Sequence, residues 1–194
     1  MAKAKPKKPT TKSAPAEPSR KDLLHDPEAL HTLVGAHGPY DPPPPPTATK
    51  GYVTWWDPGS SIQTLVQKHP TLFYIPRLFA GERCAKESDA WKWRQWRVEP
   101  IAPNLTFEKQ QKHLTTGDEP ASARELVMYL ALVFLTTGER LDLGRLRCKD
   151  LAASGQRMTV WFSPSGFDLA SVSDQWKSPG IGLSVMSTPV VRRK

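Results

Sequence analysis

Ten consecutive apolar residues, Leu126 to Leu135, constrain the fold of this chain more than any other feature. The run is about half the length needed to cross a bilayer, and it has no polar face. A helix of that kind buries its whole circumference in a protein core. Because Ser122 and Glu125 precede it with the spacing of a capping box, we predict a central buried helix over residues 122–137.

The sequence after this helix changes to patterns of period two. Apolar side chains alternate with polar ones in segments separated by tight turns, which is typical of strands with one buried face. These segments cover residues 146–150, 158–162, 167–172 and 181–185. We therefore predict an α+β fold in which an antiparallel β meander packs on the central buried helix.

Shorter elements are predicted ahead of the central helix. A strand should end in the turn at 55–59, and Ser60 or Ser61 can cap a helix that finishes before Pro70. Residues 72–75 are apolar and aromatic, which favours a strand. A further helix is expected over residues 106–114.

Positive charge is concentrated at the two ends of the chain. The formal net charge is +8, of which residues 1–21 carry seven cations against one acid and residues 192–194 carry three cations. The remaining stretch, 22–191, holds 17 cations and 18 acids. The Lys-, Pro-, Ala- and Thr-rich tail buries too little apolar surface to fold, so we predict a disordered basic N-terminal arm over 1–21. It either contacts polyanions without reading sequence or solubilises the chain.

The chain is expected to divide into four parts. After the tail, residues 22–49 form a short helix, capped by Asp26 and stopped by Gly35, and a Pro-rich linker. The five prolines of 42–46 predict a polyproline II rod, which is either a stiff spacer or a ligand for an aromatic groove. A single α+β domain should follow over residues 50–191, and residues 192–194 make a basic C-terminal end.

Composition excludes several classes of protein. Two cysteines are too few for a disulfide-rich scaffold or a Cys-based zinc finger. The first thirty residues contain no apolar core of a secretory signal, and no run is long enough for a membrane span. We therefore expect a cytoplasmic protein without a membrane partner.

Several spaced motifs carry a resemblance to a known family. They are Trp56–Gly59, Arg94–Pro100, Phe107–Gln111, Ala123-Arg124 leading to 137–141, and Arg147-Cys148 before a strand hairpin. Together they resemble a family of short bacterial proteins, over roughly residues 51–191. The resemblance implies a bacterial, cytoplasmic setting and a single domain. It supplies no activity, cofactor, partner or functional residue.

The segment 91–97 has the densest mixture of indoles and cations. It is either a platform for single-stranded nucleic acid, with rings on bases and cations on phosphates, or a strand with buried indoles and outward basic side chains. We expect at least one side to be buried against the central helix, so that Trp93 contributes strongly to stability and Arg94 does not. In an extended strand one side holds Trp91, Trp93 and Arg97, and the other holds Lys92, Arg94 and Trp96.

Residues suited to catalysis form no recognisable constellation. Cys84 lies among charged residues, of which two cations could lower its thiol pKa, but a structural thiol is the simpler interpretation. Cys148 is expected to be buried in a strand. His25, His31 and His37 recur every six residues, which does not place them on one helical face. We therefore predict no cofactor and no metal.

These observations favour a non-enzymatic module that binds another macromolecule. The expected partner is an unidentified protein. The alternative is a weak, sequence-independent nucleic-acid binder that uses the basic tail and the segment 91–97. An enzyme has no supporting motif.

Removal of residues 1–21 should leave the fold intact, because the tail carries charge without apolar partners. A chain that starts at Lys50 should melt cooperatively within a few degrees of the full chain, as followed by circular dichroism. A large loss of cooperativity would show that the removed residues pack on the body.

Overall fold

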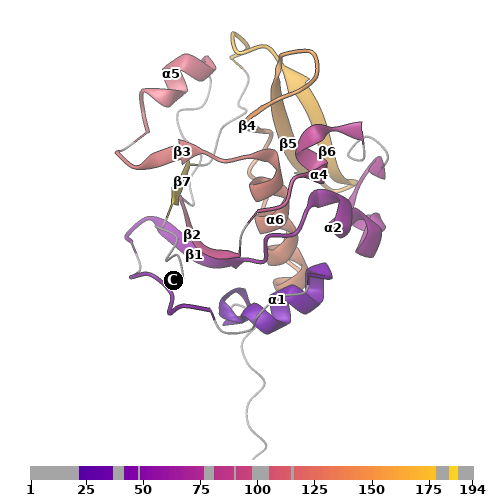
Figure 1. Cartoon of the computed structure of the whole chain (residues 1–194). Coiled ribbons are helices and arrows are strands. Elements are labelled where there is room, and N and C mark those ends of the chain that lie inside the picture. Colours follow the sequence, from indigo (N-terminus) through magenta and orange to yellow (C-terminus); the bar gives the residue numbers. More distant parts are fainter. Residues whose placement is uncertain are drawn as a thin grey trace, which may run out of the picture.

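The computed structural model describes residues 22–36, 42–47, 49–76, 81–89, 91–97, 105–114, 116–177 and 184–187, the last of these as backbone. Within them the chain has the predicted α+β fold, with two antiparallel sheets around one helix (Figure 1). The expectations for the arm 1–21 and for the end 192–194 concern residues outside this description.

Helices and strands alternate irregularly along the chain. The helices are η1 (Asp22–His25), α1 (Pro27–Val34), α2 (Ile62–Lys68), η2 (Pro70–Leu72), α4 (Arg83–Lys86), α5 (Phe107–Gln111) and α6 (Ala123–Thr137). The strands are β1 (Tyr52–Asp57), β2 (Lys92–Arg97), β3 (Asp118–Pro120), β4 (Leu146–Leu151), β5 (Arg157–Ser163), β6 (Gly166–Val172) and β7 (Ser184–Ser187). One sheet has the order β1-β2-β7-β3, and the other has the order β4-β5-β6.

The predicted central helix is α6, which stands between the two sheets in Figure 1. Both bonds of its capping box are present: the Ser122 hydroxyl accepts from the Glu125 N–H, and the Glu125 carboxylate accepts from the Ser122 N–H. Gly138 ends the helix with φ of 75°. Residues 123–133 are all buried, as expected for a helix with no polar face. No helix in the described ranges is both long and apolar enough to cross a membrane.

The predicted meander is the β4-β5-β6 sheet, and it packs on α6 as expected. The last strand is different: β7 pairs with β2 and β3 in the other sheet. Spacing along the chain predicts that strands exist but not which sheet edge they join. The partner strand β3 is only three residues long and contains Pro120, so it gave no signal.

Two short elements also differ from the prediction. Residues 70–72 form a 3-10 turn, with Pro70 at its first position, and only Phe73 makes a bridge, to Phe167 of β6. The expected strand over 72–75 is therefore wrong, because proline at the start of a tight turn bends the segment away from the sheet. The helix expected over 106–114 ends at Gln111.

The β1–β2 pair is covered on both faces. On one face, Trp96 packs with Trp55 of β1 and Tyr129 of α6. On the other face, the Trp93 indole donates to the Pro43 carbonyl at 2.6 Å, so the Pro-rich segment lies against the sheet. Both indoles of β2 are consequently buried.

The short helix α1 joins the same core. Its cap is as predicted, with the Asp26 carboxylate accepting from the Ala29 N–H and Gly35 in the left-handed region. Leu30 and Val34 are fully buried against the core that α6 organises. The division of the chain into domains stays a prediction, but the helix is packed on the body rather than separated from it.

A network of buried charges lies where β1, β2 and α6 meet. Asp57, at the end of β1, accepts from the guanidinium groups of Arg94 on β2 and Arg124 on α6. Arg94 also pairs with Glu125 of α6, at 2.5 Å. The outward direction expected for the basic side chains of this segment, on which the small contribution of Arg94 to stability rested, is therefore wrong for Arg94: its side chain faces α6 and pairs with two carboxylates there.

The electrostatics of this network follow from its pairing. Burial alone would raise the pKa of Asp57, but Arg124 and Arg94 together hold it below its usual range. Burial would lower the pKa of Arg124, and the charge of Asp57 raises it instead. Asp57 is therefore ionised in the folded chain near neutral pH.

Replacement of Arg94 by alanine should destabilise the fold by about 3–5 kcal/mol, because Asp57 and Glu125 would keep buried charge without this partner. Urea unfolding followed by tryptophan fluorescence measures the loss. The matched control is Arg97→Ala on the same strand, whose partly exposed side chain makes no ion pair with the described residues. We expect about 1 kcal/mol or less for it. Equal effects of the two substitutions would contradict the structural importance of the network.

Candidate functional site

The face of the β4–β6 sheet that is turned away from α6, called the outer face below, carries most of the chemistry that the core leaves accessible. Alternate residues of each strand point to opposite faces, and Leu146, Val160 and Phe167 occupy the inner one. Their neighbours therefore face outward. Four of the outward residues on or beside β4 and β5 are cations: Arg145, Arg147, Lys149 and Arg157.

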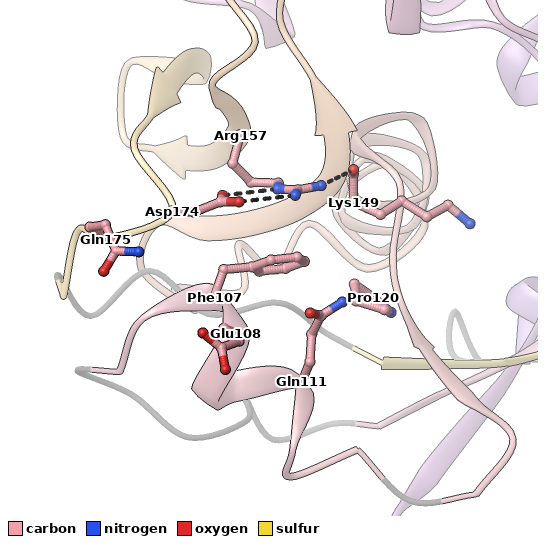
Figure 2. A pocket seen from close by; sticks show the side chains of 8 residues that line it. All are labelled: Phe107, Glu108, Gln111, Pro120, Lys149, Arg157, Asp174 and Gln175. Atoms are coloured by element: carbon pink, nitrogen blue, oxygen red, sulfur yellow. Dashed lines mark hydrogen bonds and ion pairs between the residues drawn. The ribbon is translucent and has the colours of Figure 1, made fainter.

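A groove of about 420 Å³ lies at one end of the outer face, between the sheet and α5 (Figure 2). The Arg157 guanidinium lies over the ring of Phe107, with its central carbon 4.1 Å from the ring centroid. It pairs with both oxygens of Asp174, each at 3.1 Å, and donates to the Lys149 carbonyl. The groove thus has an aromatic floor and a guanidinium–carboxylate pair in its wall.

Arg147 lies beside this groove and is fully buried. Its guanidinium donates to the Gln110 side chain at 2.8 Å and to the Trp176 carbonyl at 2.6 Å, while its Nε has no hydrogen-bond partner. Within the described residues it forms no ion pair. Burial lowers its pKa, the charge of Asp174 opposes that change, and the charge of Arg157 adds to it. A buried cation with only neutral acceptors is electrostatically uncompensated.

The other end of the outer face exposes an aromatic ring beside an ion pair. Trp161 is 37% exposed and lies opposite Asp168 of β6. Arg145 sits 5.7 Å from the Trp161 ring centroid and 3.5 Å from the Asp168 carboxylate. Tyr74, which is 59% exposed, follows Phe73 in a bend whose backbone lies against the start of β6. We call these four residues the aromatic patch.

The edge of β6 beside this patch is only partly paired. The Tyr74 N–H donates to the Phe167 carbonyl at 3.0 Å, so the backbone groups of Phe167, Leu169 and Ser171 point away from β5. Gly166 allows this approach, since a Cβ there would lie 2.7 Å from the Leu72 carbonyl oxygen. Beyond Phe167, no described segment pairs with the edge.

The candidate segment 91–97 has a different environment from the outer face. Trp93, Arg94 and Trp96 are buried between the N-terminal segment and α6, as described above. Lys92 pairs with Asp89 at 3.0 Å. Trp91 is 38% exposed and borders an open hollow of about 550 Å³. Binding by this segment stays a prediction, with Trp91 as its most accessible ring.

The two thiols are buried and unreactive by environment. Burial, followed by the charges of Asp150 and Glu82, raises the pKa of Cys84 to about 12. Burial likewise raises the pKa of Cys148 well above its usual value. The hypothesis that cations activate Cys84 is therefore wrong, because carboxylates are its dominant charged neighbours. In the described part of the chain, no three His, Cys, Asp or Glu residues are arranged to hold a metal ion.

Sequence patterns located part of the outer face. Alternation already placed Arg147 and Lys149 opposite the buried residues of β4, and the same rule applied to Trp161 would have turned its ring outward. Nothing local predicted that Arg145 would lie beside Trp161, since it comes from a separate turn. The groove depends on α5 and Asp174, which are far apart in sequence.

Comparisons of the chain with protein-family models, curated proteins and solved structures give no match. The resemblance to a bacterial family stays a prediction. Its motifs nevertheless meet in space: Asp57, Arg94 and Arg124 form the buried network, and Gln110 contacts Arg147 beside the groove.

Neither cysteine should react with a thiol reagent such as DTNB at pH 8 while the chain is folded, because both are buried with raised pKa values. Two equivalents should react after unfolding in denaturant. Rapid modification of one thiol in the native chain would show an accessible, activated cysteine and would reopen a nucleophilic role.

Proposed function

We propose that the chain is a non-enzymatic module that binds a protein partner in the bacterial cytoplasm, and that the aromatic patch is the centre of its binding surface. The single observation that carries this proposal is the exposed Trp161 ring beside the Arg145–Asp168 pair, with exposed Tyr74 next to the start of β6. Tryptophan, tyrosine and arginine are the residue types most enriched at energetic hot spots of protein interfaces.

The energetics of the patch support a protein rather than a small ligand. Rings of this kind can bury on the order of 150–250 Å² each, and none of the four patch residues lines the groove at the other end of the face. Arg145 is held over the Trp161 ring before any partner arrives, so little side-chain entropy is lost on binding.

The open edge of β6 supports an extended segment as the partner's contacting element. The outward backbone groups of Leu169 and Ser171 offer a template on which a further strand can add. The chain itself uses the start of this edge, where Phe73 bridges to Phe167. A partner strand that continued along the edge would bring its side chains onto the aromatic patch.

The nucleic-acid alternative rests on the basic tail and on Trp91. The burial of Trp93 and Trp96 leaves a single accessible indole in 91–97, which weakens the stacking platform. A salt series of DNA and RNA binding tests it: a steep loss of affinity with salt supports the alternative, and no binding at low salt removes it.

The experiment compares capture of partners from a native lysate by the full chain and by Trp161→Ala. We expect the proteins enriched by the wild type, quantified by mass spectrometry, to be lost with Trp161→Ala, since truncation of a hot-spot residue costs 2 kcal/mol or more, about thirtyfold in affinity. Ser171→Pro, which an edge strand tolerates, should reduce capture too, whereas Ser171→Ala should not.

The matched control is Leu151→Ala, which removes an exposed apolar side chain at the end of β4, outside the patch. It should capture the same proteins as the wild type. Circular dichroism establishes that each variant is folded. Identical capture by Trp161→Ala and the wild type would place the binding surface elsewhere.

A further inference from the structure

A buried cation lies beside the groove of the outer face. The two cations that line the groove are paired: Lys149 with Glu119 at 3.3 Å, and Arg157 with Asp174. Arg147, which is fully buried, has only neutral hydrogen-bond acceptors among the described residues. The charge of Asp174 acts on it through space, but Asp174 is the ion-pair partner of Arg157.

The geometry suits an oxyanion at the mouth of the groove. Lys149 and Arg157 line it from adjacent strands, and Arg147 is the next outward residue before Lys149 on β4. The partners of the two accessible cations are half-exposed carboxylates, with side-chain exposures of 47% for Glu119 and 44% for Asp174. The Lys149–Glu119 pair is partly exposed on both sides and contributes little, so a ligand can replace it. The Arg157–Asp174 pair is bidentate and its arginine is only 15% exposed, so a ligand must offer Arg157 an acceptor at least as good.

The rest of the groove is larger than an inorganic anion requires. Phe107 and Pro120 give it apolar surface, and the carboxamides of Gln111 and Gln175 add donors and acceptors (Figure 2). A volume of about 420 Å³ is at the size of a small-ligand site.

We propose that this groove binds the phosphate group of a small phosphate ester of mononucleotide size. The phosphate lies against Lys149 and Arg157, where it also compensates the charge of buried Arg147, and the organic part lies against Phe107 and Pro120. The Arg157 guanidinium and the Lys149 ammonium supply the donors for the acceptor oxygens of a phosphate monoester. The site is independent of the aromatic patch.

Asp174 is the intramolecular competitor for this ligand. Its carboxylate occupies both donors that Arg157 would offer to a phosphate, and it would repel an incoming dianion. The proposal therefore requires that loss of the Asp174 charge strengthens binding. A purely structural ion pair between the two residues has no such consequence.

The test measures binding of adenosine monophosphate to the full chain by isothermal titration calorimetry at constant ionic strength. We expect Asp174→Asn to bind several-fold more tightly and Lys149→Met to bind about tenfold more weakly, as for loss of one charge-assisted hydrogen bond. Lys149 is 39% exposed, so its substitution leaves the fold intact. The control is Lys86→Met, which removes one exposed positive charge on α4 and changes no residue that lines the groove, so it should leave binding unchanged.

Binding of further ligands shows which kind of phosphate compound the groove prefers. Adenosine, which lacks the phosphate, should not bind, and inorganic phosphate should bind more weakly than the nucleotide. Tighter binding of a phosphoserine peptide than of the nucleotide would overturn the assignment to a small ester. Absence of nucleotide binding would overturn the site itself. Equal binding by the wild type, Asp174→Asn and Lys149→Met would overturn it too, and would attribute the measured affinity to attraction by the basic tail.

Discussion

The ion pairs between Asp57 and the arginines Arg94 and Arg124 are the interaction on which the rest of the structure depends. They join the end of β1, the middle of β2 and the first turn of α6, which are distant in sequence. Removing charges from water is costly, and the pairs repay that cost only in one geometry. The network therefore fixes how the β1–β2 pair lies against α6, and apolar packing around Trp55, Trp96 and Tyr129 alone would be less specific about direction and register.

This network also changes how the segment 91–97 should be interpreted. In the sequence its cations and indoles have the composition of a nucleic-acid surface, but Arg94 neutralises buried carboxylates and Trp96 fills the core. The Pro-rich segment covers the opposite face through Trp93. An accessible ring beside an arginine is instead found on the outer face of the second sheet, where Arg145 lies by the partly exposed Trp161.

Local signals in the sequence were enough for the elements that local physics determines. The capping box, the all-apolar run and Gly138 define α6, and alternation defines the three strands of the meander. Pairing between distant segments was beyond the same rules: β7 joins β2 because of where α6 and β3 place that edge, and the inward turn of Arg94 depends on Asp57, 37 residues earlier. The groove and the aromatic patch are assembled from turns, α5 and two or three strands. Sequence alternation could therefore predict only the outward direction of Arg147, Lys149 and Trp161.

The two proposed sites share one sheet face and yet are physically separate. Trp161 and Arg157 are four residues apart on β5, about 13 Å along the strand. Between them, Thr159 is buried and donates to the Ala170 carbonyl, which closes the face to any ligand continuous with both ends. Groups at that separation without a shared partner act nearly independently. The proposed phosphate site beside Arg147 therefore does not depend on whether Trp161 binds a protein, and either proposal can fail without removing the physical argument for the other.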